Sequence, residues 1–310
     1  MNHLTDLMPE LQRDCVYDIA EYLRPSLFID VGAAAGHVVQ EVSNKWIASL
    51  EEAVGFEPFP NNHQYFEANT KDCDCAVRLI KKAVSDEQSQ ATFFVSATVQ
   101  GNETGWEDYV GYSSLGSLLS SLTLTQRIKN RLKYLVFDLW KRKGTDEQKF
   151  LTVETTTLDH EFNHQQLMQS ATFLKIDVQG AEEQVLNGSR QLLSSGSLDI
   201  IYIEWSGETS VLDILSTHGY TIYDTTYVVF AKEMDSVHLF EELGMEYMDT
   251  VQLSTGRQAY EMIMKDDPLT VINKIKKHRL GNIQTDLIAV HDKKHSEFLD
   301  AIQTYQKKYI

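Results

Sequence analysis

The sequence predicts an α/β protein built on a doubly wound, mostly parallel β-sheet. Between residues 27 and 90, apolar runs of strand length alternate with segments of helical spacing in the order strand, helix, strand, helix, strand. The first run, Leu27–Val31, ends at a turn of small residues that contains Gly32 and Gly36. After residue 150 the alternation resumes, and two more apolar runs end in acids. Such alternation is typical of parallel strands joined by right-handed helical crossovers.

Composition narrows the classes of function. The chain has 310 residues, 42% of them hydrophobic, which is enough for one large core with insertions. The formal net charge of −17 argues against general nucleic-acid binding, because the average surface would be repelled by the phosphate backbone. No basic segment precedes an apolar core near residue 1, and no stretch reaches about 18 apolar residues. We therefore expect no transmembrane segment and a cytoplasmic protein.

The N-terminal part is expected to contain four strands. Apolar residues recur at helical spacing from Leu7 to Leu23, and Pro25 ends that helix. Pro58 and Pro60 prevent the second strand from continuing as an inner strand and favour a turn into a helix. The expected strands are 27–31, 53–56, 76–84 and 92–96, and the expected helices are 7–23, about 36–49 and about 62–69.

A central insertion is expected from 97 to 149. Residues 101–122 are rich in Gly, Ser and Thr and contain several aromatic residues, which favours a folded loop on the substrate side. Residues 124–143 have apolar side chains at spacings of three and four with basic residues among them, which predicts a basic amphipathic helix. The basic face is either an ordinary solvated face or a surface for an acidic, phosphorylated or membrane-surface partner.

The alternation is expected to continue to the end of the sequence. Asp159 is expected to cap a helix that runs to Gln169. Residues 233–268 carry no clear pattern. The remaining expected strands are 150–155, 172–177, 199–204, one from 220 and 286–290. The remaining expected helices are one that follows residue 177 and runs to 193, and those at 211–217, 269–279 and 296–305. These elements suggest a helical N-terminal extension at 1–26, a main domain at 27–232 and a C-terminal elaboration at 233–310 that completes or covers the sheet.

Four acids stand at the ends of expected strands, namely Asp30, Glu57, Asp177 and Glu204. Ligands of open parallel sheets bind outside the carboxyl ends of the strands, so these acids are expected to converge on one rim. The glycine turn allows close backbone approach, and the helix after it presents free N–H groups, so the stretch predicts a nucleotide clamp in which Glu57 accepts ribose hydroxyls. The spacing is not that of the dinucleotide GxGxxG pattern, because Ala34 stands where that pattern needs its second glycine.

Lys175 is an ionisable residue in a strand that should be covered on both faces. It shares one strand face with Asp177, and burial of its ammonium would require a carboxylate such as Asp177 or Glu204. The pair is either an ion pair that fixes the strand ends or a tuned site. Asp177 with Glu204 could also hold a divalent cation, although no cluster has diagnostic ligand spacing. A lone histidine such as His160 is more often structural than catalytic.

The cysteines predict a reducing compartment. Cys15, Cys73 and Cys75 are odd in number and follow no disulfide pattern. Cys73 and Cys75 also lie too close in sequence to form an ordinary unstrained bridge.

Several motifs occur in an order that resembles the FkbM family of methyltransferases, which are class I (Rossmann-like) enzymes dependent on S-adenosylmethionine. The motifs are LFIDVGAAAG, VGFEPFP, the KAVSD turn, SSL at Ser113–Leu115, VETTTLD, FLKIDVQGAEEQVLNG and IIYIEWS. The resemblance covers about Leu27 to Glu204.

The resemblance implies a role for particular residues. Glu57 matches the acid that binds both ribose hydroxyls, and Asp177 stands where such enzymes often place a residue between cofactor and substrate, here with Lys175 and Glu204 in support. The implied cofactor-binding residues are Asp30, Gly32, Ala33, Gly36, His37, Glu57, Pro58, Val84 and Ser85. Two positions depart from the family pattern, since Ala34 replaces a usual asparagine and Gln179 replaces a usual glutamate.

The activity that the resemblance implies is O-methylation of a hydroxyl on a sugar, glycan or secondary metabolite. N-methylation of a small molecule is the nearest alternative. A nicotinamide-dependent oxidoreductase and a catalytically silent cofactor-binding protein also remain open, because either could share the strand, the turn and the acid.

Overall fold

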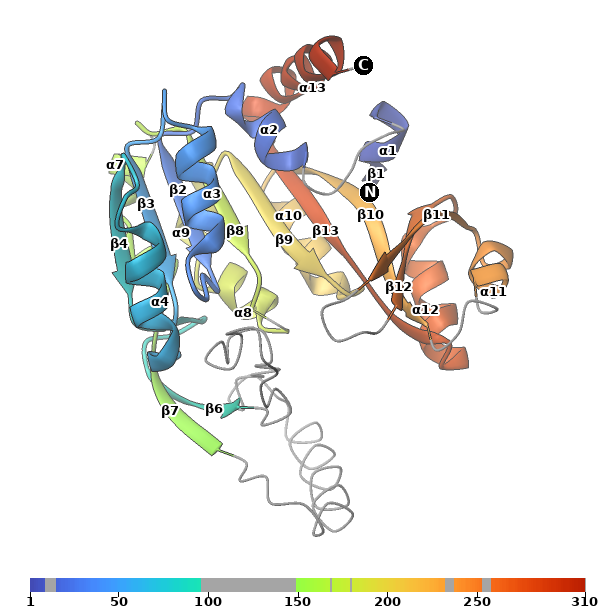
Figure 1. Cartoon of the computed structure of the whole chain (residues 1–310), viewed down its shortest axis with the longest axis horizontal. Helices are drawn as coiled ribbons and strands as arrows, with labels where there is room; N and C mark the ends of the chain where they lie inside the picture. The colour runs from blue at the N-terminus through green and yellow to red at the C-terminus, as the bar shows by residue number, and fades with distance from the viewer. Residues whose placement is uncertain are drawn as a thin grey trace. The chain divides into compact units, whose positions relative to one another are not determined.

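The computed structural model describes residues 1–8, 15–95, 149–167, 169–178, 180–231, 237–252 and 258–309 (Figure 1). The chain divides into two compact units. The first unit comprises Met1–Ser26, Leu167–Lys175 and Leu193–Ile310, and the second comprises Leu27–Gln166 and Ile176–Leu192. The predicted insertion, its SSL motif and its basic helix at 124–143 lie outside the described residues, apart from Lys149. Within the described ranges, no helix is both long enough and apolar enough to cross a membrane.

Three parallel strands form the centre of the second unit, as the sequence predicts. β2 (Leu27–Val31) lies beside β3 (Glu52–Phe56), which lies beside β4 (Ala76–Ile80). All five side chains of β2 are buried. Burial on both faces explains why the sequence of this strand is a nearly continuous apolar run. The crossovers are α3 (His37–Lys45) and α4 (Pro60–Thr70), which contact each other in front of these strands in Figure 1. The carboxyl ends of β2 and β3 therefore point the same way.

The expected strand at 76–84 is two strands, because the chain turns after β4. Lys82 N–H donates to the carbonyl of Ile80, and β5 (Ala83–Val84) then leaves the first sheet. β5 pairs in parallel with β7 (Lys149–Thr156), and β7 pairs antiparallel with β6 (Gln90–Val95). These strands form a separate three-stranded sheet in the order β5-β7-β6.

The prediction of one helix from Asp159 to Gln169 is wrong, because Thr157 and not Asp159 caps the helix that begins here. Two short helices take its place, α6 (Leu158–Glu161) and α7 (His164–Leu167). Thr157 caps α6 by accepting the N–H of His160 at 3.1 Å. The Asp159 carboxylate instead accepts the N–H groups of Gln191 at 2.9 Å and Leu192 at 3.0 Å. It therefore caps α9 (Arg190–Ser194), which follows α8 (Glu182–Asn187) where a single helix was expected.

Six of the strands described in the first unit lie in the order β11-β12-β10-β13-β9-β8. In this order, each neighbouring pair between β11 and β9 is antiparallel. The strands are β8 (Thr172–Ile176), β9 (Ile200–Trp205), β10 (Tyr220–Ala231), β11 (Met245–Gln252), β12 (Gln258–Met264) and β13 (Gly281–His291). The protein thus has the predicted α/β fold with a mostly parallel central sheet, and the antiparallel pairs gather in its C-terminal strands.

Helices and a short N-terminal strand complete the first unit. The three C-terminal elements expected at 269–279, 286–290 and 296–305 are confirmed as α12, β13 and α13, while the unpatterned residues 233–268 contain α11, β11 and β12. The helices are α1 (Leu4–Leu7), α2 (Cys15–Glu21), α10 (Thr209–Thr217), α11 (Val237–Glu242), α12 (Pro268–His278), the 3₁₀ turn η5 (Asp292–Lys294) and α13 (His295–Tyr309). α2 and α13 pack together (Figure 1).

The N-terminal extension, expected to be helical, begins with strand β1 (Asn2–His3), which pairs in parallel with β10. His3 Nδ1 lies 2.9 Å from both carboxylate oxygens of Asp224, a side chain that is 1% exposed. Tyr227 donates its hydroxyl to the same carboxylate at 2.7 Å. The bond to Asp224 raises the pKa of His3 above its ordinary 6.5 despite partial burial.

We expect His3 to make stability depend on pH. Because its folded-state pKa is raised, the stabilisation is fully present below the unfolded pKa and is lost as pH rises through the folded pKa. Chemical denaturation of the natural protein from about pH 5.5 to about pH 9 should show this decline, and His3→Gln should flatten it. His238→Gln, at a side chain that is 86% exposed, is the matched control. Superimposable profiles for the natural protein and His3→Gln would contradict the assignment.

Candidate active site at the carboxyl ends of the parallel strands

A turn of small residues follows β2 and leads into α3. Gly32, Ala34 and Gly36 have positive φ angles of 91°, 46° and 78°. The N–H groups of Gly32 and Ala33 donate to the carbonyl of Phe56, at 3.1 and 3.0 Å. The turn is therefore fastened to the end of the neighbouring strand β3.

The glycines of this region are required by the protein's own packing. A Cβ on Gly32 would lie 2.0 Å from the backbone oxygen of Asp177, and one on Gly36 would lie 2.8 Å from the ring of Phe66. Gly55, inside β3, approaches the same ring, which a Cβ there would meet at 2.5 Å. Gly32 and Gly36 also need the left-handed conformation that glycine adopts readily. Any larger residue would displace either β8's end or α4.

The Glu57 carboxylate ties the end of β3 to this turn. Oε2 accepts the N–H of Ala34 at 2.8 Å, and Oε1 accepts the N–H of Phe59 at 2.7 Å. The side chain is only 5% exposed. A carboxylate has about four acceptor positions, so the group keeps capacity for a further hydroxyl beside these N–H groups and the buried Asn62 side chain.

Burial controls the charge of Glu57. Desolvation raises its pKa to about 7, and the nearby Asp30 acts in the same direction, whereas the Phe59 and Ala34 N–H groups lower it. Asp30, on β2, is fully buried. The two neighbouring buried carboxylates make this corner of the site attractive to a cation.

Asp177, directly after β8, lies against the same turn through its backbone. Its N–H donates to the carbonyl of Val31 at 3.0 Å, and its own carbonyl faces Gly32. The structure therefore brings Asp30, Glu57 and the backbone of Asp177 to the glycine turn. Of the four predicted strand-end acids, Asp30 and Glu57 therefore lie close together, and Asp177 joins them through its backbone.

The turn at Val84–Ser85 is buried against α8's end. Ser85 is 3% exposed, and its N–H donates to the carbonyl of Thr156 at 2.8 Å. A Cβ on Gly188 would lie 2.0 Å from the Ser85 oxygen, so Gly188 allows this contact.

The other predicted site residues differ in burial and belong to both units. Ala33 is buried and Pro58 is half-buried beside Glu57, while His37 is exposed on the first turn of α3. Lys175, buried on β8, and Glu204, half-buried on β9, belong to the first unit, whereas Asp177 belongs to the second. Glu204 stands opposite Asp286 of β13. The grouping of Lys175 and Glu204 with Asp177 stays a prediction.

Within the described residues, no group of three or more His, Cys, Asp or Glu side chains is placed to hold a metal ion. The three cysteines are free thiols. Cys73 and Cys75 line a hollow of about 480 Å³ beside Phe66 and Thr70.

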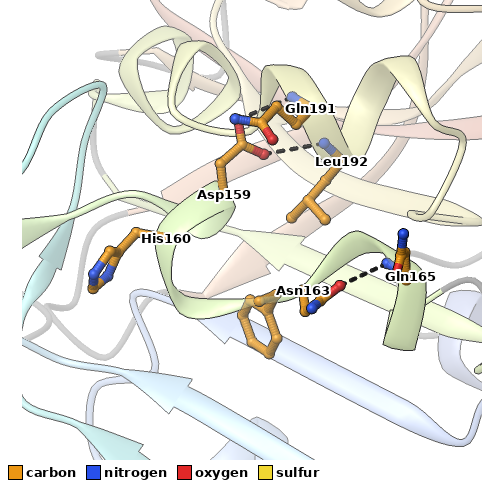
Figure 2. Close-up of a pocket in the computed structure, with 7 residues that line it drawn as sticks. Asp159, His160, Asn163, Gln165, Gln191 and Leu192 are labelled. Carbon is orange, nitrogen blue, oxygen red and sulfur yellow. Dashed lines mark hydrogen bonds between the residues drawn. The ribbon is translucent and has the colours of Figure 1, made fainter.

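A polar hollow of about 410 Å³ lies where α6 and α7 meet α9 (Figure 2). Figure 2 shows the Asp159 carboxylate turned toward the N–H groups of α9, and His160 projecting away from Asn163 and Gln165. His160 Nδ1 lies 3.4 Å from the Glu161 carboxylate. The acid and the histidine that sequence analysis singled out here thus have separate partners and do not form a catalytic pair.

Two residues that shape the site were not singled out from the sequence. Phe66 supports Gly36 and Gly55 together, and its role depends on contacts that no local pattern reveals. Gly55 did carry a signal, because an isolated glycine inside a strand marks close approach of another group.

The structure is an α/β fold in which a glycine turn and a buried acid lie at the carboxyl ends of parallel strands, the edge where ligands of such sheets generally bind. Residues 30–222 match the methyltransferase FkbM domain, which is more than half of the chain. The protein belongs to the FkbM methyltransferase family.

Comparisons with solved structures give distant similarities. Methyltransferase FkbM from Methylobacillus flagellatus KT is 15% identical, with 65% of this chain and 40% of that chain covered and a TM-score of 0.39. Precorrin-6y C5,15-methyltransferase from Geobacter metallireducens GS-15 is 12% identical, with 91% and 90% covered and a TM-score of 0.36. The chain thus spans less than half of the Methylobacillus protein. A comparison with curated proteins gives no match.

Ala34 provides a test of the turn, because it holds a left-handed conformation without being glycine or asparagine. The left-handed conformation costs an alanine about 1–2 kcal/mol, which glycine would not lose. Glycine also has a larger conformational entropy in the unfolded state, which offsets about 0.4–1 kcal/mol of the stability gained by the substitution. Ala34→Gly should therefore raise the free energy of unfolding by about 0.5 kcal/mol, measured by chemical denaturation.

Ala35→Gly is the matched control, since Ala35 has no positive φ. It should lower the free energy of unfolding by about 0.5–1 kcal/mol. Equal losses in both variants would show that the conformation of Ala34 is not strained.

Proposed function

We propose that the protein transfers a methyl group from S-adenosylmethionine to a hydroxyl of a sugar, glycan or secondary metabolite. Membership of the FkbM methyltransferase family supports the reaction class. The observation that carries the cofactor assignment is the buried Glu57 carboxylate, which is tied to the glycine turn and keeps acceptor capacity beyond these two bonds.

The chemistry of the residues at this rim fits the cofactor. The Glu57 oxygens would accept the two ribose hydroxyls, and the carboxylates of Asp30 and Glu57 favour a positively charged sulfonium. The turn from Gly32 to His37 would hold the amino-acid part, and Val84 with Ser85 would lie near adenine. The proposed cofactor-binding residues are Asp30, Gly32, Ala33, Gly36, His37, Glu57, Pro58, Val84 and Ser85.

The sulfonium, when bound, supplies a methyl group already activated by positive charge. The chain then has to orient the acceptor oxygen for in-line attack and receive its proton. We assign the orienting or proton-accepting role to Asp177, whose backbone lies against the cofactor turn. Lys175 and Glu204 are proposed to support it.

Direct binding and transfer measurements distinguish the candidate functions. Titrations with S-adenosylmethionine, its demethylated product and NAD come first, followed by labelled methyl transfer to panels of hydroxyl-bearing and amine-bearing acceptors. Binding of NAD alone would favour an oxidoreductase, and transfer only to amines would favour N-methylation. Cofactor binding without turnover on any acceptor would favour a silent binding protein.

Cofactor affinity should depend on the ionisation of Glu57. Because its pKa is raised to about 7, the carboxylate form dominates only above that pH, and affinity should fall as pH drops below it. The decline should approach about tenfold per pH unit, measured by calorimetric titration.

Glu57→Gln should weaken binding at high pH by about 1.5–3 kcal/mol and flatten the profile. Glu67→Gln is the matched control, because Glu67 lies on α4 with a side chain that is 61% exposed. A sloping profile in Glu57→Gln would assign the pH dependence to another group.

Asp177→Asn should reduce turnover far more than cofactor binding, because the amide cannot accept a proton from the acceptor. We expect a loss of about 100-fold or more in kcat with little change in the cofactor dissociation constant. Asp74→Asn, at an exposed residue, is the control. Unchanged turnover in Asp177→Asn would remove this residue from the mechanism.

A further inference from the structure

The Glu182 side chain folds back over the segment that follows Asp177. Its Oε1 accepts the N–H of Gly180 at 3.0 Å and lies 3.4 Å from the N–H of Val178. Glu182 is 7% exposed, so its carboxylate is largely removed from water at the start of α8.

Val178, one of the two residues bonded to Glu182, also lies close to the glycine turn. A methyl of Val178 lies 3.5 Å from the Cβ position of Gly32, next to the Asp177 carbonyl that occupies the same place. Asp177 is itself held by its N–H bond to Val31. Val178 therefore lies beside the open side of Gly32 and is bonded to Glu182 through its N–H.

The described contacts of Gly180 are few. Its φ is 104°, and among the described residues no atom lies within 4 Å of the place where its Cβ would be. Glycine is thus needed here for conformation and not for close packing. The bond from its N–H to Glu182 is the hydrogen bond that the structure describes for this residue.

We propose that Glu182 is a positioning residue, which holds the backbone of Val178 and Gly180 and so keeps Asp177 in register with the cofactor turn. The inference rests on the proposed function, because the turn matters as a cofactor site. Glu182 does not touch the reacting atoms; it acts through Val178 and Asp177.

The test compares Glu182→Ala, Glu182→Gln and the control Glu183→Ala, which removes an exposed carboxylate from the same helical turn. Glutamine keeps an acceptor oxygen at the same reach, so it should bind S-adenosylmethionine within about twofold of the natural protein. Glu182→Ala leaves two N–H groups without this acceptor and should weaken binding by about five- to tenfold in calorimetric titrations.

Hydrogen exchange provides a readout that does not require the cofactor. The amides of Val178 and Gly180 should exchange about tenfold faster in Glu182→Ala and at the natural rate in Glu182→Gln and Glu183→Ala. Glu182→Asp, one methylene shorter, should resemble the alanine variant and replaces it if that variant does not fold.

Natural affinity and exchange in Glu182→Ala would overturn the proposal, as would equal losses in the alanine and glutamine variants. Absence of S-adenosylmethionine binding by the natural protein would instead overturn the proposed function. In that case the exchange rates still decide whether Glu182 holds Val178 and Gly180.

Discussion

The candidate site depends on one buried carboxylate. Glu57 directly follows β3, and its carboxylate accepts hydrogen bonds from the N–H groups of Ala34 and Phe59. These bonds join the glycine turn after β2 to the segment that leads into α4. Burial makes each of these bonds stronger than it would be in water, and it also makes the charge costly, which explains a pKa near neutrality. The geometry of the turn and the charge of the site are therefore set by the same group.

The glycines around this carboxylate serve the protein's own packing as much as any ligand. Gly32 allows the Asp177 carbonyl to reach the turn, and Gly36 and Gly55 together make room for the Phe66 ring. Packing against α4 and against the backbone of Asp177 therefore shapes the turn within the protein's own fold. Binding to such a preformed site costs less conformational entropy. Substitutions at these glycines will therefore affect stability and binding together.

Local patterns predicted most strands and helices, and they failed where a partner far along the chain decided the outcome. Apolar runs located β2, β3, β8 and β9 because buried parallel strands have a distinctive composition. Asp159 was expected to cap the helix that follows it, yet its carboxylate caps α9, more than thirty residues away in the sequence. A capping side chain can bond any helix start within reach, and the sequence does not say which one is near.

By itself, the sequence determined the α/β class, the glycine turn and the acids at the strand ends, because these depend on local apolar patterning and on backbone freedom at single residues. Only the tertiary structure decided what the turn rests on. The Ala34 N–H meets Glu57, the Asp177 carbonyl faces Gly32, and Phe66 fills the space that two glycines leave. Contacts of this kind arise when strands far apart in sequence end at one rim, so their distances follow from the packing of the sheet and not from any segment alone.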